Sequence, residues 1–123
     1  MKQMFFAFAF LFITATGICQ PKLEIAEAKR NFGFVKRGIV VKCDYEISNV
    51  GNQPLILDDA EVACSCTTVD YPDEPILPNQ KATIVVSFDT KSAYGRQDRI
   101  VKIFSNDPKS PAKLRFKGTV SQN

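Results

Sequence analysis

The side chains best suited to chemistry in this 123-residue chain are three cysteines, because the chain contains no histidine. The three are Cys43, Cys64 and Cys66, and the last two stand one residue apart. If residues 63–69 are extended, the thiols of Cys64 and Cys66 point to one face, about 6.6 Å apart. A disulfide brings its Cβ atoms within roughly 3.5–4.5 Å. The pair is therefore predicted not to close on itself without a sharp local bend.

Two other arrangements are open to the pair, and both involve Cys43. A disulfide from Cys43 to Cys64 or to Cys66 would join two strands and stabilise the domain by about 2–4 kcal/mol. The third thiol would then be buried or reactive. Alternatively, Cys43, Cys64 and Cys66 would share one metal ion, and three sulfurs without an imidazole favour copper(I). The disulfide or buried-thiol interpretation is the first expectation, metal binding is the alternative, and thiol redox chemistry is the third.

Enzymatic chemistry finds little support in the remaining residues. Without histidine, cysteine peptidases, serine triads and zinc hydrolases lack their base or their ligand. The densest acidic cluster is Asp58-Asp59-Glu61, a candidate for weak calcium binding, and no glycine-rich phosphate loop occurs. We therefore predict no catalytic residues, no cofactor and no enzymatic activity, with copper(I) as the alternative cofactor.

The first nineteen residues have the layout of a secretory signal peptide. Lys2 precedes an apolar run, Met4–Ile13, and mostly small residues lead up to Cys19. The run is too short to span a membrane, which takes about 20 apolar residues. Cleavage after Cys19 predicts a periplasmic or secreted protein that begins at Gln20. Cleavage before Cys19 would make it a lipoprotein anchored to a membrane, although the preceding Ile18 is not the small residue expected there.

Residues 20–123 are predicted to form one domain with a single core. Removal of Lys2 with the signal peptide lowers the formal net charge from +3 to +2. The basic residues are dispersed along the sequence as singles and pairs, without the cluster typical of nucleic-acid-binding proteins. We therefore expect no nucleic-acid partner, and a membrane association only if Cys19 is lipidated.

Short alternating segments separated by turn residues predict an all-β fold. Residues 40–49 alternate apolar and polar side chains, as in a half-buried antiparallel strand. Residues 81–88 and 99–105 are also predicted strands, and a final strand is expected to be broken by Gly118. Some seven short strands in about one hundred residues are typical of an immunoglobulin-like (Ig-like) antiparallel β-sandwich.

Four motifs, in order along the chain, resemble those of the DUF1573 family of exported bacterial Ig-like domain proteins. That family looks related to the wider Ig-like class of ASPM, SPD-2 and Hydin. The motifs are Asn31-Phe32-Gly33-Phe34-Val35-Lys36-Arg37-Gly38, Ser48-Asn49-Val50-Gly51-Asn52-Gln53-Pro54-Leu55, Ala63-Cys64-Ser65-Cys66-Thr67-Thr68 and Glu74-Pro75-Ile76-Leu77-Pro78-Asn79. The resemblance implies the fold and export, and leaves the biochemical activity unassigned. Relatives often have histidine near the position of Cys43, which suggests a cluster of that residue with the C-x-C pair.

Two functions follow as expectations. The first is a non-enzymatic binding or assembly module in which an edge strand or end loop engages another exported or envelope protein, since exposed sandwich edges accept added strands. The second is a periplasmic copper(I)-type protein that uses Cys43, Cys64 and Cys66.

Overall fold

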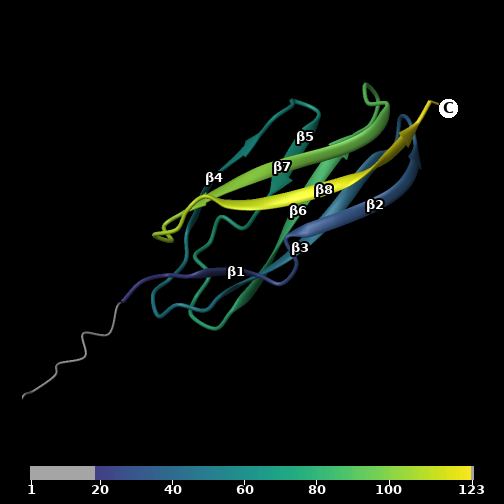
Figure 1. Cartoon of the computed structure of the whole chain (residues 1–123). Coiled ribbons are helices and arrows are strands. Elements are labelled where there is room, and N and C mark those ends of the chain that lie inside the picture. The colour runs from purple at the N-terminus through teal and green to yellow at the C-terminus, as the bar shows by residue number, and fades with distance from the viewer. Residues whose placement is uncertain (1–18, 123) are drawn as a thin grey trace, which may run out of the picture.

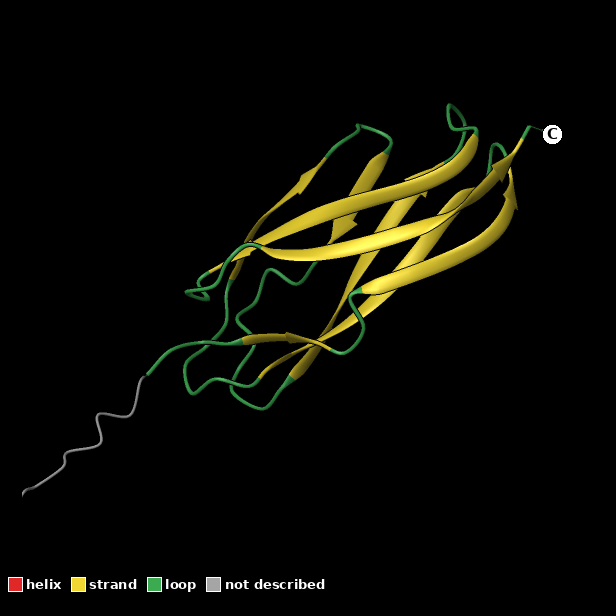
Figure 2. Cartoon of the chain, viewed as in Figure 1, coloured by secondary structure: helices red, strands yellow, loops and turns green. Residues whose placement is uncertain are grey.

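A computed structural model describes residues 19–122, and this part of the chain is all β (Figures 1 and 2). Eight strands form two four-stranded sheets that pack face to face. The predicted Ig-like β-sandwich is confirmed, with eight strands in place of about seven. Residues 19–122 contain no helix that could cross a membrane. The predicted signal peptide lies outside the described residues, except for Cys19.

The strand order is β1-β3-β6-β5 in sheet one and β2-β8-β7-β4 in sheet two. Sheet one consists of β1 (Leu23–Ile25), β3 (Val40–Asn49), β6 (Lys81–Asp89) and β5 (Thr67–Asp70). Sheet two consists of β2 (Lys29–Lys36), β8 (Ala112–Ser121), β7 (Gly95–Ser105) and β4 (Leu57–Val62). The sandwich is not purely antiparallel, because β2 runs parallel to β8. The chain thus enters sheet one through β1 and crosses at once to the edge of sheet two.

The core forms where the apolar sides of the two sheets meet. Strand β3 has the predicted bounds, and its side chains alternate between buried and exposed up to Ile47. Tyr45 on this strand is 0% exposed, and its hydroxyl donates a hydrogen bond to the carbonyl oxygen of Arg115 on β8 at 2.7 Å. Burial raises the pKa of this phenol and keeps it neutral. One buried side chain therefore links the two sheets through a polar contact.

The predicted break at Gly118 is wrong, because β8 continues through it to Ser121. A Cβ atom at position 118 would lie 2.3 Å from the ring of Phe32. That ring packs with its centroid 6.1 Å from Phe88 and 6.4 Å from Phe116. The glycine makes room for an aromatic core cluster and does not end the strand.

Asn49 explains the second sequence motif, because its side chain ties together the segments at one end of the sandwich. It is 0% exposed. Its Nδ2 donates to the carbonyl oxygens of Gln53 and Ile76, at 2.7 and 2.8 Å. Its Oδ1 accepts from the backbone N–H groups of Gly51 and Lys22, at 3.0 and 3.3 Å. All the hydrogen-bonding capacity of this buried amide is used, as burial requires.

Candidate functional site

The C-x-C pair closes on itself, contrary to the sequence prediction. Cys64 and Cys66 form a disulfide with an S–S distance of 1.96 Å and a Cα–Cα distance of 5.2 Å. The prediction assumed an extended chain, whereas residues 63–66 form a bend and a turn. The N–H of Thr67 donates to the carbonyl oxygen of Cys64 at 3.1 Å, which marks this tight turn. The sharp local bend that the pair needed is therefore the connection between β4 and β5.

Cys43 takes no part in this bridge, so the predicted disulfide from Cys43 to Cys64 or to Cys66 is wrong. Its thiol is free and buried on β3, where Cys43 is paired with Val86 of β6. Burial raises the pKa of this thiol, the ordinary state of an unreactive core cysteine. The expectation of a buried thiol thus holds for Cys43.

The described residues do not form the predicted metal cluster. Within residues 19–122, no three cysteine, aspartate or glutamate side chains lie close enough to hold a metal ion. Neither the three cysteines Cys43, Cys64 and Cys66 nor the acidic cluster Asp58-Asp59-Glu61 forms such a group. With Cys64 and Cys66 bridged to each other, neither offers a thiolate. Copper(I) binding by the reduced protein stays a prediction.

The disulfide turn has a direct effect on the edge of sheet two. Strand β4 pairs with β7 only as far as Val62, which lies opposite Val101. The turn then carries the chain across to β5 in sheet one. On the side away from β8, residues 95–100 of β7 consequently pair with no strand of the part of the chain that the structure describes. We call this stretch the open edge.

The backbone groups at the open edge can be identified from one hydrogen bond on the neighbouring strand. The N–H of Arg115 on β8 donates to the carbonyl oxygen of Ala28 at 2.8 Å, so it points away from β7. Alternate residues of a strand direct their backbone groups to opposite sides. With the register that pairs Ile100 with Arg115, the backbone N–H and C=O groups of Arg96, Asp98 and Ile100 face away from β8. Ile100 lies beside Ala63, where the last pair of the β4 ladder, Val62 with Val101, ends, so Arg96 and Asp98 are the residues whose backbone groups face the open edge.

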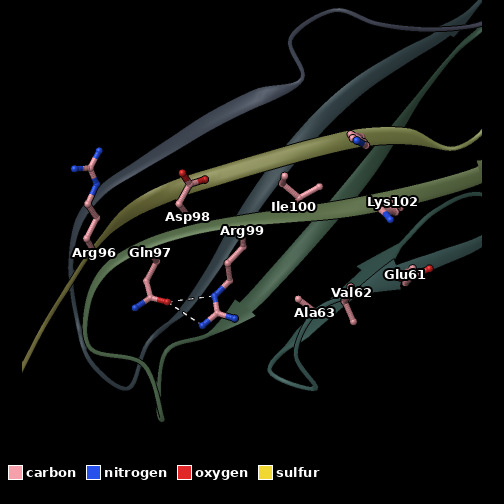
Figure 3. A pocket seen from close by; sticks show the side chains of 10 residues that line it. Glu61, Val62, Ala63, Arg96, Gln97, Asp98, Arg99, Ile100 and Lys102 are labelled. Atoms are coloured by element: carbon pink, nitrogen blue, oxygen red, sulfur yellow. Dashed lines mark hydrogen bonds between the residues drawn. The ribbon is translucent and has the colours of Figure 1, made fainter.

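A groove of about 560 Å³ runs along this edge (Figure 3). Three consecutive residues at the end of β4, Glu61, Val62 and Ala63, form one wall, and residues 96–100 of β7 form the other. In Figure 3, Gln97 and Arg99 point to one side of β7, whereas Asp98 and Ile100 point to the other. The groove therefore continues the line of β4 beyond the point where β4 ends.

Arg99 is the side chain in the groove best placed to bind a ligand. Its Nε and Nη2 donate to Oε1 of Gln97 at 3.2 and 2.9 Å, as the dashed lines in Figure 3 show. Its guanidinium carbon lies 4.9 Å from the centroid of the Phe88 ring. Gln97 is held in turn by its hydrogen bond to the carbonyl oxygen of Tyr94 at 3.0 Å. Arg99 forms no ion pair within residues 19–122, so its charge is available to a carboxylate.

The outward side of the same strand is different, because its acid is already paired. The Asp98 carboxylate accepts hydrogen bonds from Nε and Nη2 of Arg115, the first at 2.6 Å. This hydrogen bonding, together with the positive charges of Arg115, Lys117 and Arg96, lowers the pKa of Asp98. Asp98 therefore stays ionised and bound to its own partner.

Sequence reasoning missed Gln97 and Arg99 because it began the strand at Arg99 and assigned no role to the residues before it. Their pattern signals only a polar start to a strand. These two residues form a candidate site because no strand pairs with β7 beside them. The C-x-C turn sets the point at which β4 stops. The C-x-C motif, interpreted as a turn, was the sequence signal from which the end of β4 could have been inferred.

Comparisons with known proteins agree with this fold. A protein of unknown function from Porphyromonas gingivalis W83 is similar, with a TM-score of 0.73 and 20% identity over 88% of this chain and 51% of the other. The ASH/PapD-like domain 7 of human CEP192 has a TM-score of 0.66 and 11% identity over 98% and 99% of the two chains. The Vibrio cholerae VesB protease has a TM-score of 0.60 and 10% identity over 84% and 32%. At these identities the likeness concerns the fold alone.

This chain spans about half the length of the Porphyromonas gingivalis protein. A comparison with proteins of curated function found no match. The model of the family described as "Protein of unknown function (DUF1573)" matches residues 23–120, which include all four sequence motifs and both sheets. The chain therefore belongs to the DUF1573 family and carries an Ig-like domain.

Proposed function

We propose that this protein is an exported, non-enzymatic binding module that accepts an extended segment of another exported or envelope protein at the open edge of β7. The observation that supports this proposal is that β4 ends at Val62, which leaves residues 95–100 of β7 without a partner strand on one side. An added strand would extend sheet two along the line that β4 leaves.

Main-chain hydrogen bonds would supply the affinity of such a complex. Two residues, Arg96 and Asp98, present their N–H and C=O groups in one row at the open edge. An extended peptide satisfies such a row whatever its sequence, while pockets for alternate side chains select among peptides. The groove of about 560 Å³ beside the row leaves room for those side chains.

Arg99 would supply selectivity for an acidic segment. Its guanidinium is held by Gln97 and the Phe88 ring before any ligand arrives. Arginine binds a carboxylate through paired, charge-assisted hydrogen bonds. An aspartate or glutamate of the added strand that points toward Arg99 would supply the carboxylate partner that this side chain lacks.

The same charges reduce pairing between two open edges. Natural sheets protect exposed edges with charged side chains, including charges that point inward. Arg96, Asp98 and Arg99 place three charges on six residues of the open edge. The edge is therefore selective, since it suits an acidic strand better than a second copy of itself.

The experiment selects peptides from a phage-displayed random nonapeptide library on immobilised protein and measures their affinity by calorimetry. Asp98→Pro removes an N–H at the open edge while leaving the hydrogen-bonding groups toward β8 in place. Asp98→Ala is its matched control, because it removes the same side chain and keeps the N–H. We expect Asp98→Pro to weaken binding at least about tenfold, the value of one hydrogen bond of about 1.4 kcal/mol, and Asp98→Ala to retain it.

Arg99→Gln tests selectivity in the same assay. The selected peptides are expected to contain Asp or Glu, and their binding to Arg99→Gln should fall about tenfold or more. Equal binding by wild type and Asp98→Pro would contradict the proposal, as would a library that yields no binder. Circular dichroism and thermal unfolding of each variant establish that it is folded.

A further inference from the structure

The two outer faces of the sandwich carry opposite charge. The outward side chains of sheet two include seven basic and three acidic residues: Lys29, Lys36, Arg96, Lys102, Lys113, Arg115 and Lys117, against Asp59, Glu61 and Asp98. Those of sheet one include two basic and five acidic residues: Lys42 and Lys81, against Glu24, Asp44, Glu46, Asp70 and Asp89. A formal net charge of only +3 for the whole chain conceals this asymmetry. We call the outer face of sheet two the basic face.

Strand alternation produces the basic face from residues that look dispersed in the sequence. Lys113, Arg115 and Lys117 stand at every second position of β8 and so share one side. The pairing register of β2 with β8 then places Lys29 of β2 beside Arg115. Basic residues that are separate in the sequence therefore become neighbours in space.

Most of this positive charge has no internal partner. Among residues 19–122, the one ion pair on the basic face joins Arg115 to Asp98. Lys29, Lys36, Arg96 and Lys117 form no ion pair with any described carboxylate. The face is consequently open to an external anion.

A hollow of about 510 Å³ lies in the basic face, between β2, β8 and the start of β7. Its floor contains the backbone of the cross-strand pair Gly33 and Gly118. A Cβ atom built at Gly33 would meet nothing within 4 Å. The missing side chain of Gly33 and the bulge of β2 at this point make the hollow, whereas the side of Gly118 that lacks a side chain faces the core, against Phe32.

The groups that line the hollow combine an aromatic ring, two cations and neutral hydrogen-bonding groups. Phe34, Thr119 and Arg96 lie in one row across three strands, and Phe34 is 77% exposed. Lys117 and Asn31 form the adjacent row. Asn31 uses its Oδ1 to accept from Gly33 N–H at 2.9 Å, which leaves its Nδ2 as a donor.

From this combination we propose that the hollow binds an anionic polysaccharide. The exposed ring of Phe34 offers its negative face to the C–H groups of a sugar ring. Arg96 and Lys117 would hold a carboxylate or sulfate group, and Asn31 and Thr119 would hydrogen-bond to the hydroxyl groups. The other cations of the face continue along β8 and suit a polymer with repeated negative charge.

A polysaccharide fits these observations better than a bilayer or a nucleic acid. A bilayer would be met by protruding apolar side chains, whereas here the aromatic ring borders a hollow with amide and hydroxyl groups. Single-stranded nucleic acid is bound by several stacked aromatic rings, and the hollow has one. The proposal concerns the outer face of the sheet, so it is independent of strand addition at the open edge.

The test measures binding of four probes to the full chain: heparin, polygalacturonate, vesicles of phosphatidylglycerol and phosphatidylcholine, and a single-stranded 20-nucleotide DNA. We expect one of the two glycans to bind most tightly. The variant Arg96→Gln/Lys117→Gln should weaken that binding at least about tenfold, since it removes two charge-assisted contacts. Phe34→Ala should weaken it several-fold. Lys42→Gln/Lys81→Gln is the control, because it removes two cations from the opposite face and should leave binding unchanged.

Each alternative result would overturn the proposal. Vesicles or DNA that bind as tightly as the glycans would assign the face to a lipid surface or to polyanions in general. An equal loss in the control variant, or no loss in Phe34→Ala, would show that the hollow is not the site. Failure of both glycans to bind would also contradict it. Peptide binding at the open edge should be the same in the Phe34→Ala variant, because Phe34 lines the hollow and not the groove, so the two proposals can fail separately.

Discussion

Replacement of Asn49 by alanine should destabilise the fold more than most single substitutions. The side chain makes four hydrogen bonds to the backbone of Lys22, Gly51, Gln53 and Ile76, and it is fully buried. At about 1 kcal/mol for each bond, the upper estimate is about 4 kcal/mol. The carbonyl oxygen of Ile76 keeps a second hydrogen bond in the variant, so about 3 kcal/mol is expected. That is a large share of the 5–15 kcal/mol typical of a domain.

Asn106 provides a matched control for this experiment. Its side chain also bonds to the backbone, with Oδ1 accepting from Ile56 N–H at 2.9 Å and Nδ2 donating to the Pro54 carbonyl oxygen at 3.0 Å. These bonds are exposed, so water replaces them, and Asn106→Ala should cost less than about 1 kcal/mol. Equilibrium unfolding in urea measures both variants. A loss in Asn49→Ala no larger than that in Asn106→Ala would refute the reasoning.

Three further predictions concern the other buried or bridged side chains. Non-reducing peptide mapping should find Cys64 joined to Cys66. Replacing both cysteines by serine should lower the free energy of unfolding by about 1.6 kcal/mol, the value for so short a loop. Loss of a bridge from Cys43 to Cys64, which would close a longer loop, would instead lower it by about 3.4 kcal/mol. Tyr45→Phe should lower the same quantity by about 1 kcal/mol through loss of its hydrogen bond across the sheets, and a value near zero in urea unfolding would count against that bond. Because burial raises the folded-state pKa of Cys43, stability should be constant below the ordinary value of 9.0 and fall as pH rises above it, in a comparison of unfolding at pH 7 and pH 10. An equal fall in Cys43→Ala would contradict this assignment.

The predictable part of the structure is the part that rests on local alternation. Strand β3 has the bounds that its polar and apolar pattern predicts, because one of its faces is buried and the other exposed. Gly118 was misread because its role depends on Phe32, a residue distant in the sequence. The C-x-C pair was misread because its geometry depends on whether the chain turns, and alternation does not report a turn of this kind. The open edge and the basic face both depend on which strands become neighbours, which period-two patterns do not specify.

The central claim, that Arg96 and Asp98 present unpaired backbone groups, can be tested by amide hydrogen exchange measured by NMR. In the free protein, these two amides should exchange fast, while those of Gln97 and Arg99, bonded to β8, should be protected. Addition of a selected peptide should slow the two fast amides and leave the other two unchanged. Uniform protection along residues 95–100 in the free protein would contradict the open edge. Fast exchange that persists in the presence of a bound peptide would contradict strand addition.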